Sequence, residues 1–276
     1  MPLVRTADLV AAAHQAGTGL AAYNVITLEH AEAIVAGAER AARPVILQIS
    51  ENAVKFHRGQ VKPIVAAAAA VAAEAGVAVA IHLDHVEDET LLRACAETAA
   101  SSVMFDASKL DYEANVAATK AAAEWANDHG LFLEAELGEV GGKDGAHAPG
   151  VRTDPDEAAA FVAATGVDAL AVAVGTSHAM ATRTATPDFD LIARLRAAVP
   201  VPLVLHGSSG VTDKDLRRAV AAGITKVNVG TILNVSFTTA VRDRLVDLAI
   251  IDPRKYLIPA RTAMADTVTT ITSTVS

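Results

Sequence analysis

The stretch VAVAIHLDH (77–85) decides how this chain folds, because an apolar run ends there in a histidine. Two later stretches, DALAVAVGTSH (168–178) and PLVLHG (202–207), have the same form. Each is typical of a buried strand that carries an imidazole at its carboxyl end. The three histidines are His85, His178 and His206. They can meet at one metal ion only if their strands are neighbours in a parallel sheet, so the pattern predicts both an architecture and a metal chemistry.

Further apolar runs occur along the chain, and alanine-rich amphipathic stretches separate them. The eight predicted strands are 20–24, 44–50, 77–85, 101–108, 131–139, 168–178, 202–207 and 224–230. Strands that alternate with helices form a parallel sheet, and eight such units in 276 residues predict an α/β fold, a (β/α)8 TIM barrel. We expect an extra helix over residues 6–16 and C-terminal helices after the barrel. Because no linker divides the sequence, residues 1–276 are expected to form a single domain.

The composition limits the classes of function. Hydrophobic residues make up 52% of the chain, which is enough for a sizeable core. A net charge of −9 and a pI near 5.4 argue against a surface for nucleic acid or for an anionic membrane. The single cysteine, Cys95, excludes an internal disulfide and fits a reducing cytoplasm. No apolar stretch has the ~20 residues needed to cross a bilayer, so we expect a cytoplasmic protein.

Polar residues gather at the carboxyl ends of nearly all the predicted strands, where barrel enzymes build their active sites. Neutral imidazoles suit zinc, and three of them leave the open coordination position that a catalytic Lewis acid requires. Glu134 and Glu136 lie two apart on one strand, so both point to the same side. For Glu136 we favour an additional metal position together with Asp106. For Glu134 this reading and a buried ion pair with Lys226 are equal alternatives.

Two glycine-containing turns follow the last two predicted strands. HGSSG (206–210) comes after the seventh strand, and NVGT (228–231) after the eighth, where the chain enters a helix. Glycine lets backbone amides approach an anion closely, and the start of a helix favours negative charge. Barrels frequently bind phosphate with the loops after strands seven and eight. The sequence therefore predicts a phosphate site here.

These residues resemble a known family, the metal-dependent class II ketose-bisphosphate aldolases. The resemblance covers almost the whole chain. The motifs that carry it are HLDH (82–85), SVMFDAS (102–108), EAELGEVGG (134–142), AVAVGTSH (171–178), LVLHGSSG (203–210), KVNVGT (226–231) and DPRKYL (252–257). The resemblance implies reversible cleavage of a ketose 1,6-bisphosphate, fructose or tagatose, to dihydroxyacetone phosphate and glyceraldehyde 3-phosphate. It also implies a homodimer or homotetramer. The chain length and the loop 138–154 are closer to the tagatose-bisphosphate aldolase-like branch.

The resemblance implies roles for individual residues. His85, His178 and His206 would hold one catalytic Zn²⁺, and Asp106 and Glu136 match an alternative metal site. Asp84 matches the carboxylate that exchanges a proton with the C4 hydroxyl. The substrate-binding candidates are Asn24, Ser50, Ala179, Gly207, Ser208, Ser209, Asn228, Val229, Gly230, Thr231 and, for the distal phosphate, Arg254. Arg254 has the alternative of a plain helix-surface residue.

The proton donor to C3 and two other functions stay open. In the family a glutamate after GG on the mobile loop gives this proton, and the matching residue here is Asp144, one methylene shorter; Glu139 is the alternative. A Schiff-base aldolase with Lys226 as nucleophile would leave the three histidines without a common purpose. A barrel that binds metal or sugar phosphate without turnover is the other alternative.

Overall fold

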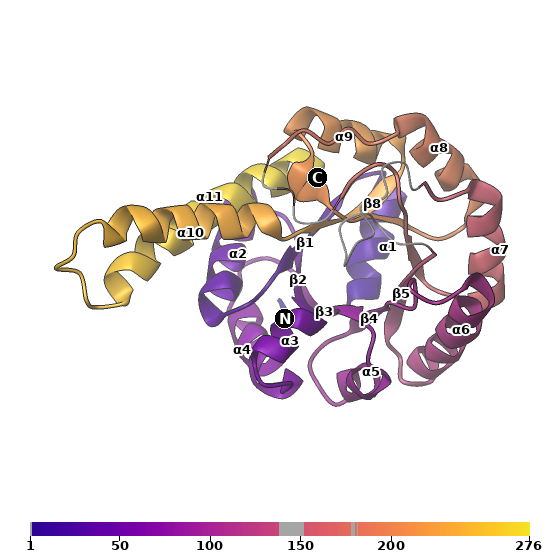
Figure 1. Cartoon of the computed structure of the whole chain (residues 1–276), viewed down its shortest axis with the longest axis horizontal. Coiled ribbons are helices and arrows are strands. Elements are labelled where there is room, and N and C mark those ends of the chain that lie inside the picture. The colour runs from indigo at the N-terminus through magenta and orange to yellow at the C-terminus, as the bar shows by residue number, and fades with distance from the viewer. Residues whose placement is uncertain (1, 138–151, 178–179, 181) are drawn as a thin grey trace.

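Eight parallel strands close into a barrel in the computed structural model of the protein, which describes residues 2–137, 152–177, 180 and 182–276 (Figure 1). Each strand pairs with its neighbours in sequence, and the first pairs with the last. The strands are β1 (Leu20–Asn24), β2 (Val45–Ser50), β3 (Val79–Val86), β4 (Ser102–Phe105), β5 (Phe132–Glu136), β6 (Ala169–Ala171), β7 (Leu203–Leu205) and β8 (Ile224–Val229). The predicted (β/α)8 fold is confirmed and all eight predicted strands are present, but β4 and β6 are shorter than predicted, and β6 ends at Ala171, before His178.

Helices precede, connect and follow the strands, and those between strands cover the outside of the barrel. They are α1 (Thr6–Ala16), α2 (Leu28–Ala41), α3 (Glu51–Phe56), α4 (Val61–Ala73), α5 (Glu89–Cys95), α6 (Tyr112–Asp128), α7 (Pro155–Thr165), α8 (Phe189–Ala198), α9 (Asp213–Ala222), α10 (Thr231–Leu245) and α11 (Arg254–Val275), with a 3-10 turn at η1 (Ser208–Gly210). Local chemistry sets their starts. At α7, for example, the Asp154 side chain accepts two backbone N–H groups and Pro155 occupies the first helical position. None of the helices in the described ranges has the length and apolar character that a membrane span requires.

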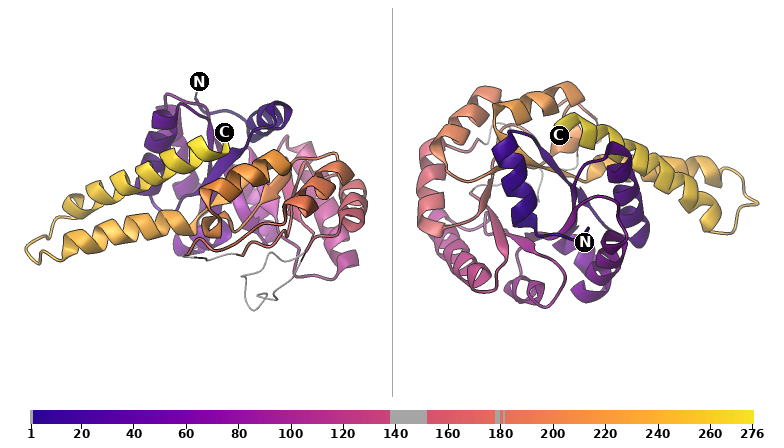
Figure 2. Two further views of the ribbon diagram at one scale, coloured as in Figure 1. Left: turned by 90° about the horizontal axis from the view of Figure 1, so that it is seen from above. Right: turned by 180° about the vertical axis from the view of Figure 1, so that it is seen from behind.

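The interior of the barrel changes from apolar at one end to polar at the other. On β3, Ile81 and Leu83 face the helices, whereas Ala80, His82 and Asp84 point inward. Ala80 packs with apolar residues of β1, β2 and the predicted first helix, α1, which lies across this end of the barrel (Figure 2, right). The opposite end, where the strands terminate, holds buried charged side chains, among them Asp84, Asp106 and Glu136.

The predicted C-terminal helices form an arm. Helices α10 and α11 pack on each other and project from the barrel, and α11 also packs against α2 (Figures 1 and 2). The segment that joins the two helices carries Val246, Leu248 and Ile251, whose exposed fractions are 80%, 93% and 87%. The arm therefore presents apolar side chains to solvent far from the barrel core.

Candidate active site

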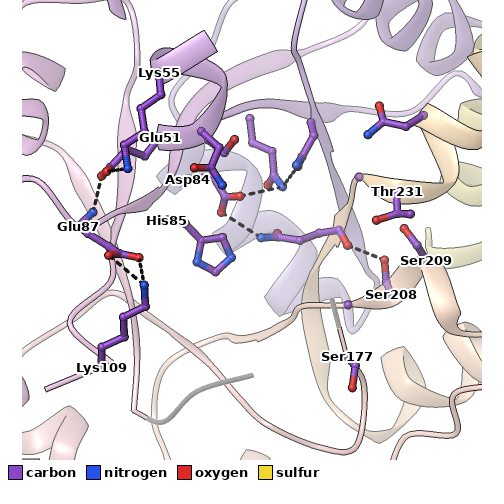
Figure 3. Close-up of a pocket in the computed structure, with 18 residues that line it drawn as sticks. Glu51, Lys55, Asp84, His85, Glu87, Lys109, Ser177, Ser208, Ser209 and Thr231 are labelled. Carbon is purple, nitrogen blue, oxygen red and sulfur yellow. Dashed lines mark hydrogen bonds and ion pairs between the residues drawn. The ribbon is translucent and has the colours of Figure 1, made fainter. Parts of the chain in front are cut away.

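A cavity of about 420 Å³ opens at the carboxyl ends of the strands. Residues from the ends of β1, β2, β3 and β8 line it, with others from the segments after β2, β3, β4, β6, β7 and β8. Asp84 and His85 lie near its middle, between Ser208, Ser209 and Thr231 on one side and two lysines on the other (Figure 3). The pocket lies at the end of the barrel where the sequence predicts the active site.

Two histidines and three carboxylates cluster beside this pocket. Ligand atoms of His85, Asp106 and Glu136 all lie within 4.8 Å of one another, and so do those of Asp84, His85 and His206. His85 Nδ1 is 2.8 Å from Asp106 Oδ2, and His206 Nδ1 is 3.6 Å from Glu136 Oε2. Imidazoles with buried carboxylates form a donor set that suits zinc and related divalent cations. These residues therefore fit the metal that the sequence predicts.

A buried glutamate contacts the ring nitrogen of His206 that points away from Glu136. Glu134 Oε1 lies 3.1 Å from His206 Nε2, and Glu134 Oε2 accepts a hydrogen bond of 2.6 Å from Lys226 Nζ. Burial alone would raise the pKa of Glu134, but Lys226 and His206 outweigh it and hold that pKa well below its usual range. Burial lowers the pKa of His206, so its ring is neutral at pH 7, as a metal ligand must be.

Two side-chain amides hold Asp84 in place. Asn228 Nδ2 donates to Asp84 Oδ1 at 3.3 Å, and Gln48 Nε2 donates to Asp84 Oδ2 at 3.5 Å. Burial would raise the pKa of Asp84, but interactions with His85 and other basic groups outweigh burial and lower it. An ionised carboxylate at this position can accept a proton from a substrate hydroxyl.

The loops after β7 and β8 meet at one end of the pocket. Gly207 has φ of 68°, and a Cβ there would lie 2.5 Å from the carbonyl oxygen of Ser177, so this turn requires glycine. The Ser208 hydroxyl donates to the Asn228 carbonyl at 2.5 Å, and Ser209 Oγ accepts the N–H of Ile232 at 3.1 Å. These bonds tie the two loops together at the first turn of α10.

Most of the predicted substrate-binding residues that the structure describes line this pocket. They are Asn24, Ser50, Gly207, Ser208, Ser209, Asn228, Gly230 and Thr231. The side chain of Val229 is instead buried in the core, so only its backbone could contact a substrate. His178, Ala179, Asp144 and Glu139 lie outside the described residues.

Arg254 does not line the pocket of its own chain. It begins α11 on the projecting arm, where its side chain is 83% exposed and its Nη2 lies 2.8 Å from Asp252 Oδ2. This is the helix-surface position that the sequence left as the alternative. The reason is the arm itself, which carries the segment away from the barrel (Figure 1).

Sequence reasoning missed eight residues that line the pocket, namely Gln48, Glu51, Asn52, Lys55, Glu87, Lys109, Ser177 and Asn234. Gln48 is the only polar residue inside the run VILQI on β2, and that interruption is a signal that could have found it. Lys55 and Lys109 carry no such signal, because they come from α3 and from the segment after β4. Lys55 Nζ lies 2.7 Å from Glu51 Oε1, and Lys109 Nζ lies 3.1 Å from Glu87 Oε1 (Figure 3).

Comparison with known proteins identifies the family of this chain. Residues 4–276 match the family described as fructose-bisphosphate aldolase class-II. A fructose-bisphosphate aldolase of Staphylococcus aureus (strain Mu50 / ATCC 700699) is 37% identical over 273 residues, which are 97% of this chain and 95% of that protein. The crystal structure of the YdjI aldolase from Escherichia coli K12 has a TM-score of 0.83 at 30% identity and covers 97% of this chain and 94% of its own.

A fructose-bisphosphate aldolase (Fba) from Campylobacter jejuni supports the fold alone, with a TM-score of 0.82 at 22% identity over 99% of this chain and 95% of its own. Fold, pocket and relatives together define a metal-dependent aldolase, an enzyme that cleaves a carbon–carbon bond. The chain belongs to the class II fructose-bisphosphate aldolase family.

Proposed function

We propose that the protein reversibly cleaves a ketose 1,6-bisphosphate, fructose or tagatose, to dihydroxyacetone phosphate and glyceraldehyde 3-phosphate, with Zn²⁺ as its metal. The observation that carries this proposal is that Asp84 and His85 line one pocket with the loops after β7 and β8, and that buried His206 lies directly beside Asp84 and His85. A cation held by His85, His178 and His206 would supply the Lewis acidity that stabilises the negative charge left on C3 when the C3–C4 bond breaks.

Asp84 is our candidate for the base. In the cleavage direction its carboxylate takes the proton of the C4 hydroxyl, and in the synthetic direction it returns that proton to the aldehyde oxygen. The bonds from Asn228 and Gln48 support this role because they fix the carboxylate without neutralising it. The proton for C3 comes, in this proposal, from Asp144, with Glu139 as the alternative.

The two ends of the pocket suit the two phosphates of such a substrate. We assign the phosphate of the dihydroxyacetone half to the amides and hydroxyls of Gly207, Ser208, Ser209 and Thr231. Lys55 and Lys109 line the opposite side (Figure 3). The ammonium groups of these lysines would bind a second phosphate, which would compete for them with Glu51 and Glu87. The presence of the two lysines at this end of the pocket supports a bisphosphate substrate.

We further propose that the arm assembles a homodimer or homotetramer. Val246, Leu248 and Ile251 are all exposed on the short segment between α10 and α11, and exposed apolar side chains that gather in one region are typical of protein interfaces. Arg254 lies on the same arm and outside its own pocket, so it could reach a distal phosphate only in another subunit. Sedimentation equilibrium tests this: Leu248→Asp with Ile251→Asp should convert the assembly to monomer, and an unchanged mass would contradict the assignment of the arm.

Steady-state cleavage of fructose and tagatose 1,6-bisphosphate, before and after chelation, tests the reaction. We expect at least one sugar to be cleaved with release of dihydroxyacetone phosphate. Chelation should abolish the activity, and added Zn²⁺ should restore it. Activity that survives complete removal of metal, verified by elemental analysis, would overturn the metal dependence. A zinc-loaded protein that binds but never cleaves either sugar would favour the non-catalytic alternative.

A further inference from the structure

We infer that Glu134 and Lys226 are positioning residues that hold His206 in the tautomer a metal ion requires. Glu134 belongs to β5 and Lys226 to β8, two strands that are not neighbours in the barrel. Their ion pair therefore crosses the barrel interior beneath the pocket. This inference rests on the proposed metal site, because it needs His206 to be a ligand.

The three side chains form a chain of contacts that excludes water. Lys226 Nζ lies 2.6 Å from Glu134 Oε2, and Glu134 Oε1 lies 3.1 Å from His206 Nε2. The exposed fraction is 1% for Lys226 and 0% for the other two side chains. Neither Glu134 nor Lys226 lines the pocket, so substrate binding does not account for them.

The contact with Glu134 fixes which ring nitrogen of His206 carries the hydrogen. An ionised carboxylate can only accept hydrogen bonds, so the hydrogen must be on Nε2. Nδ1 then has the lone pair, and this nitrogen lies on the side of Glu136 and the other candidate metal ligands. A carboxylate behind a histidine also makes the imidazole a stronger ligand, and it is a common arrangement at metal sites.

Lys226 keeps this carboxylate an acceptor. The Lys226 ammonium is a donor only, so Glu134 Oε2 accepts its hydrogen bond and Glu134 Oε1 stays directed at His206 Nε2. Stability gives no competing reason for the pair, because apolar residues of similar size usually serve a buried site as well or better. The lysine thus acts on His206 through Glu134 and without touching it.

The tautomer can be read directly in the unmodified protein. In metal-free full-length protein with ¹⁵N-labelled histidine, two-bond correlation spectra distinguish Nε2–H from Nδ1–H rings. We expect Nε2–H for His206, assigned by the signal that His206→Gln removes. A hydrogen on Nδ1 would overturn the inference, and this measurement holds even if variants of the ion pair fail to fold.

Zinc affinity, measured by competition with a chromophoric chelator, tests the consequence. Glu134→Gln and Lys226→Met should each weaken binding about 10- to 100-fold, the usual effect of losing a residue that orients a metal ligand. The double variant should be no weaker than the weaker single variant, because the lysine acts through the glutamate. The visible spectrum of the Co²⁺-loaded protein should also change in Glu134→Gln, which a merely structural defect would not produce.

Ser102→Ala is the matched control. Ser102 is as buried as Glu134 and faces the same barrel interior, but its hydroxyl bonds His82 and Thr6 and not the metal cluster. Its zinc affinity should stay within about twofold of the wild type.

Wild-type protein that binds no zinc would defeat the proposed function itself. Wild-type binding with unchanged affinity in Glu134→Gln would defeat only the positioning role, and additive effects of the two variants would defeat the link through Glu134.

Discussion

Asp84 and His85 are consecutive residues of β3, and both side chains reach the same pocket. In a regular strand consecutive side chains point to opposite faces. His85 departs from this geometry with φ of 49°, and the pairing of β3 with β4 shifts its register between Leu83 and Val86. The irregularity brings the His85 imidazole to Asp106 while Asp84 still points inward. The proposed base and the proposed metal ligand thus lie side by side because His85 has a left-handed backbone within the strand.

The backbone at His85 can be tested with two variants of similar size. His85→Asn and His85→Thr both remove the imidazole, but asparagine tolerates left-handed backbone far better than a β-branched residue. In metal-free protein we expect the threonine variant to have a free energy of unfolding about 1 kcal/mol lower than the asparagine variant. Urea denaturation measures the difference. Equal stabilities would mean that the positive φ stores no strain.

Asp84→Asn should remove the base and leave the cavity shape intact. We expect kcat to fall by about 10²- to 10⁴-fold, the usual contribution of a positioned base, while the zinc content by elemental analysis stays at the wild-type level. Because the pKa of Asp84 lies below its usual value, the wild-type carboxylate is already ionised at pH 5. It should therefore give kcat no acidic limb between pH 5 and pH 8. An unchanged kcat would show that another group takes the proton.

The barrel could be predicted from sequence because its physical cause is local. A strand covered on both faces reads as an apolar run, and in a parallel barrel all strand ends meet at one face. Asp84, His206 and Asn228 follow or interrupt such runs and do meet. The arm was harder: α10 has Leu233 as its one buried residue, so its sequence contains no apolar stripe that fixes its direction. The position of Arg254 could not follow from pattern.

The site was only partly predictable, because sequence spacing does not report irregular backbone or convergence between loops. Alternation along β3 would place His85 on the outer face, opposite Asp84, and nothing in HLDH announces the left-handed residue. Lys55 and Lys109 are far apart in sequence and lie in ordinary polar segments. They line one pocket because the segments after β2 and β4 both begin at the same end of the barrel.

Gly207→Ala and Gly166→Ala distinguish the proposed substrate-binding role of the loop after β7 from the general effect of backbone strain. The two glycines have φ of 68° and 71°, but a Cβ on Gly207 would strike Ser177, whereas a Cβ on Gly166 meets nothing within 4 Å. Gly166→Ala should lower the free energy of unfolding by about 1 kcal/mol with normal KM. Gly207→Ala should lower it further and raise KM for the bisphosphate. Equal effects of the two variants on KM would contradict a role of this loop in binding.

His82 should make the protein sensitive to acid. Burial, with a smaller effect of Lys226, lowers the pKa of His82 from 6.5 to about 3. Below pH 6.5 the unfolded chain therefore binds a proton that the folded chain does not. The free energy of unfolding should fall by about 1.4 kcal/mol per pH unit for this group as the pH drops from 6.5 towards 3. Urea unfolding between pH 7 and pH 5 should show a shallower slope in His82→Gln, and parallel slopes would mean that His82 titrates normally in the fold.

Borohydride trapping tests the Schiff-base alternative at Lys226. An imine would need this amine to lose its proton and reach the substrate carbonyl, but Lys226 is 1% exposed, bonds Glu134 at 2.6 Å and does not line the pocket. We expect borohydride with either bisphosphate to leave Lys226 unmodified in peptide mass analysis. Surface lysines that react slowly are identified by their equal labelling in Lys226→Met. Substrate-dependent labelling of Lys226 in the wild type would show that the reaction proceeds through an imine at this amine and would contradict the metal-dependent mechanism.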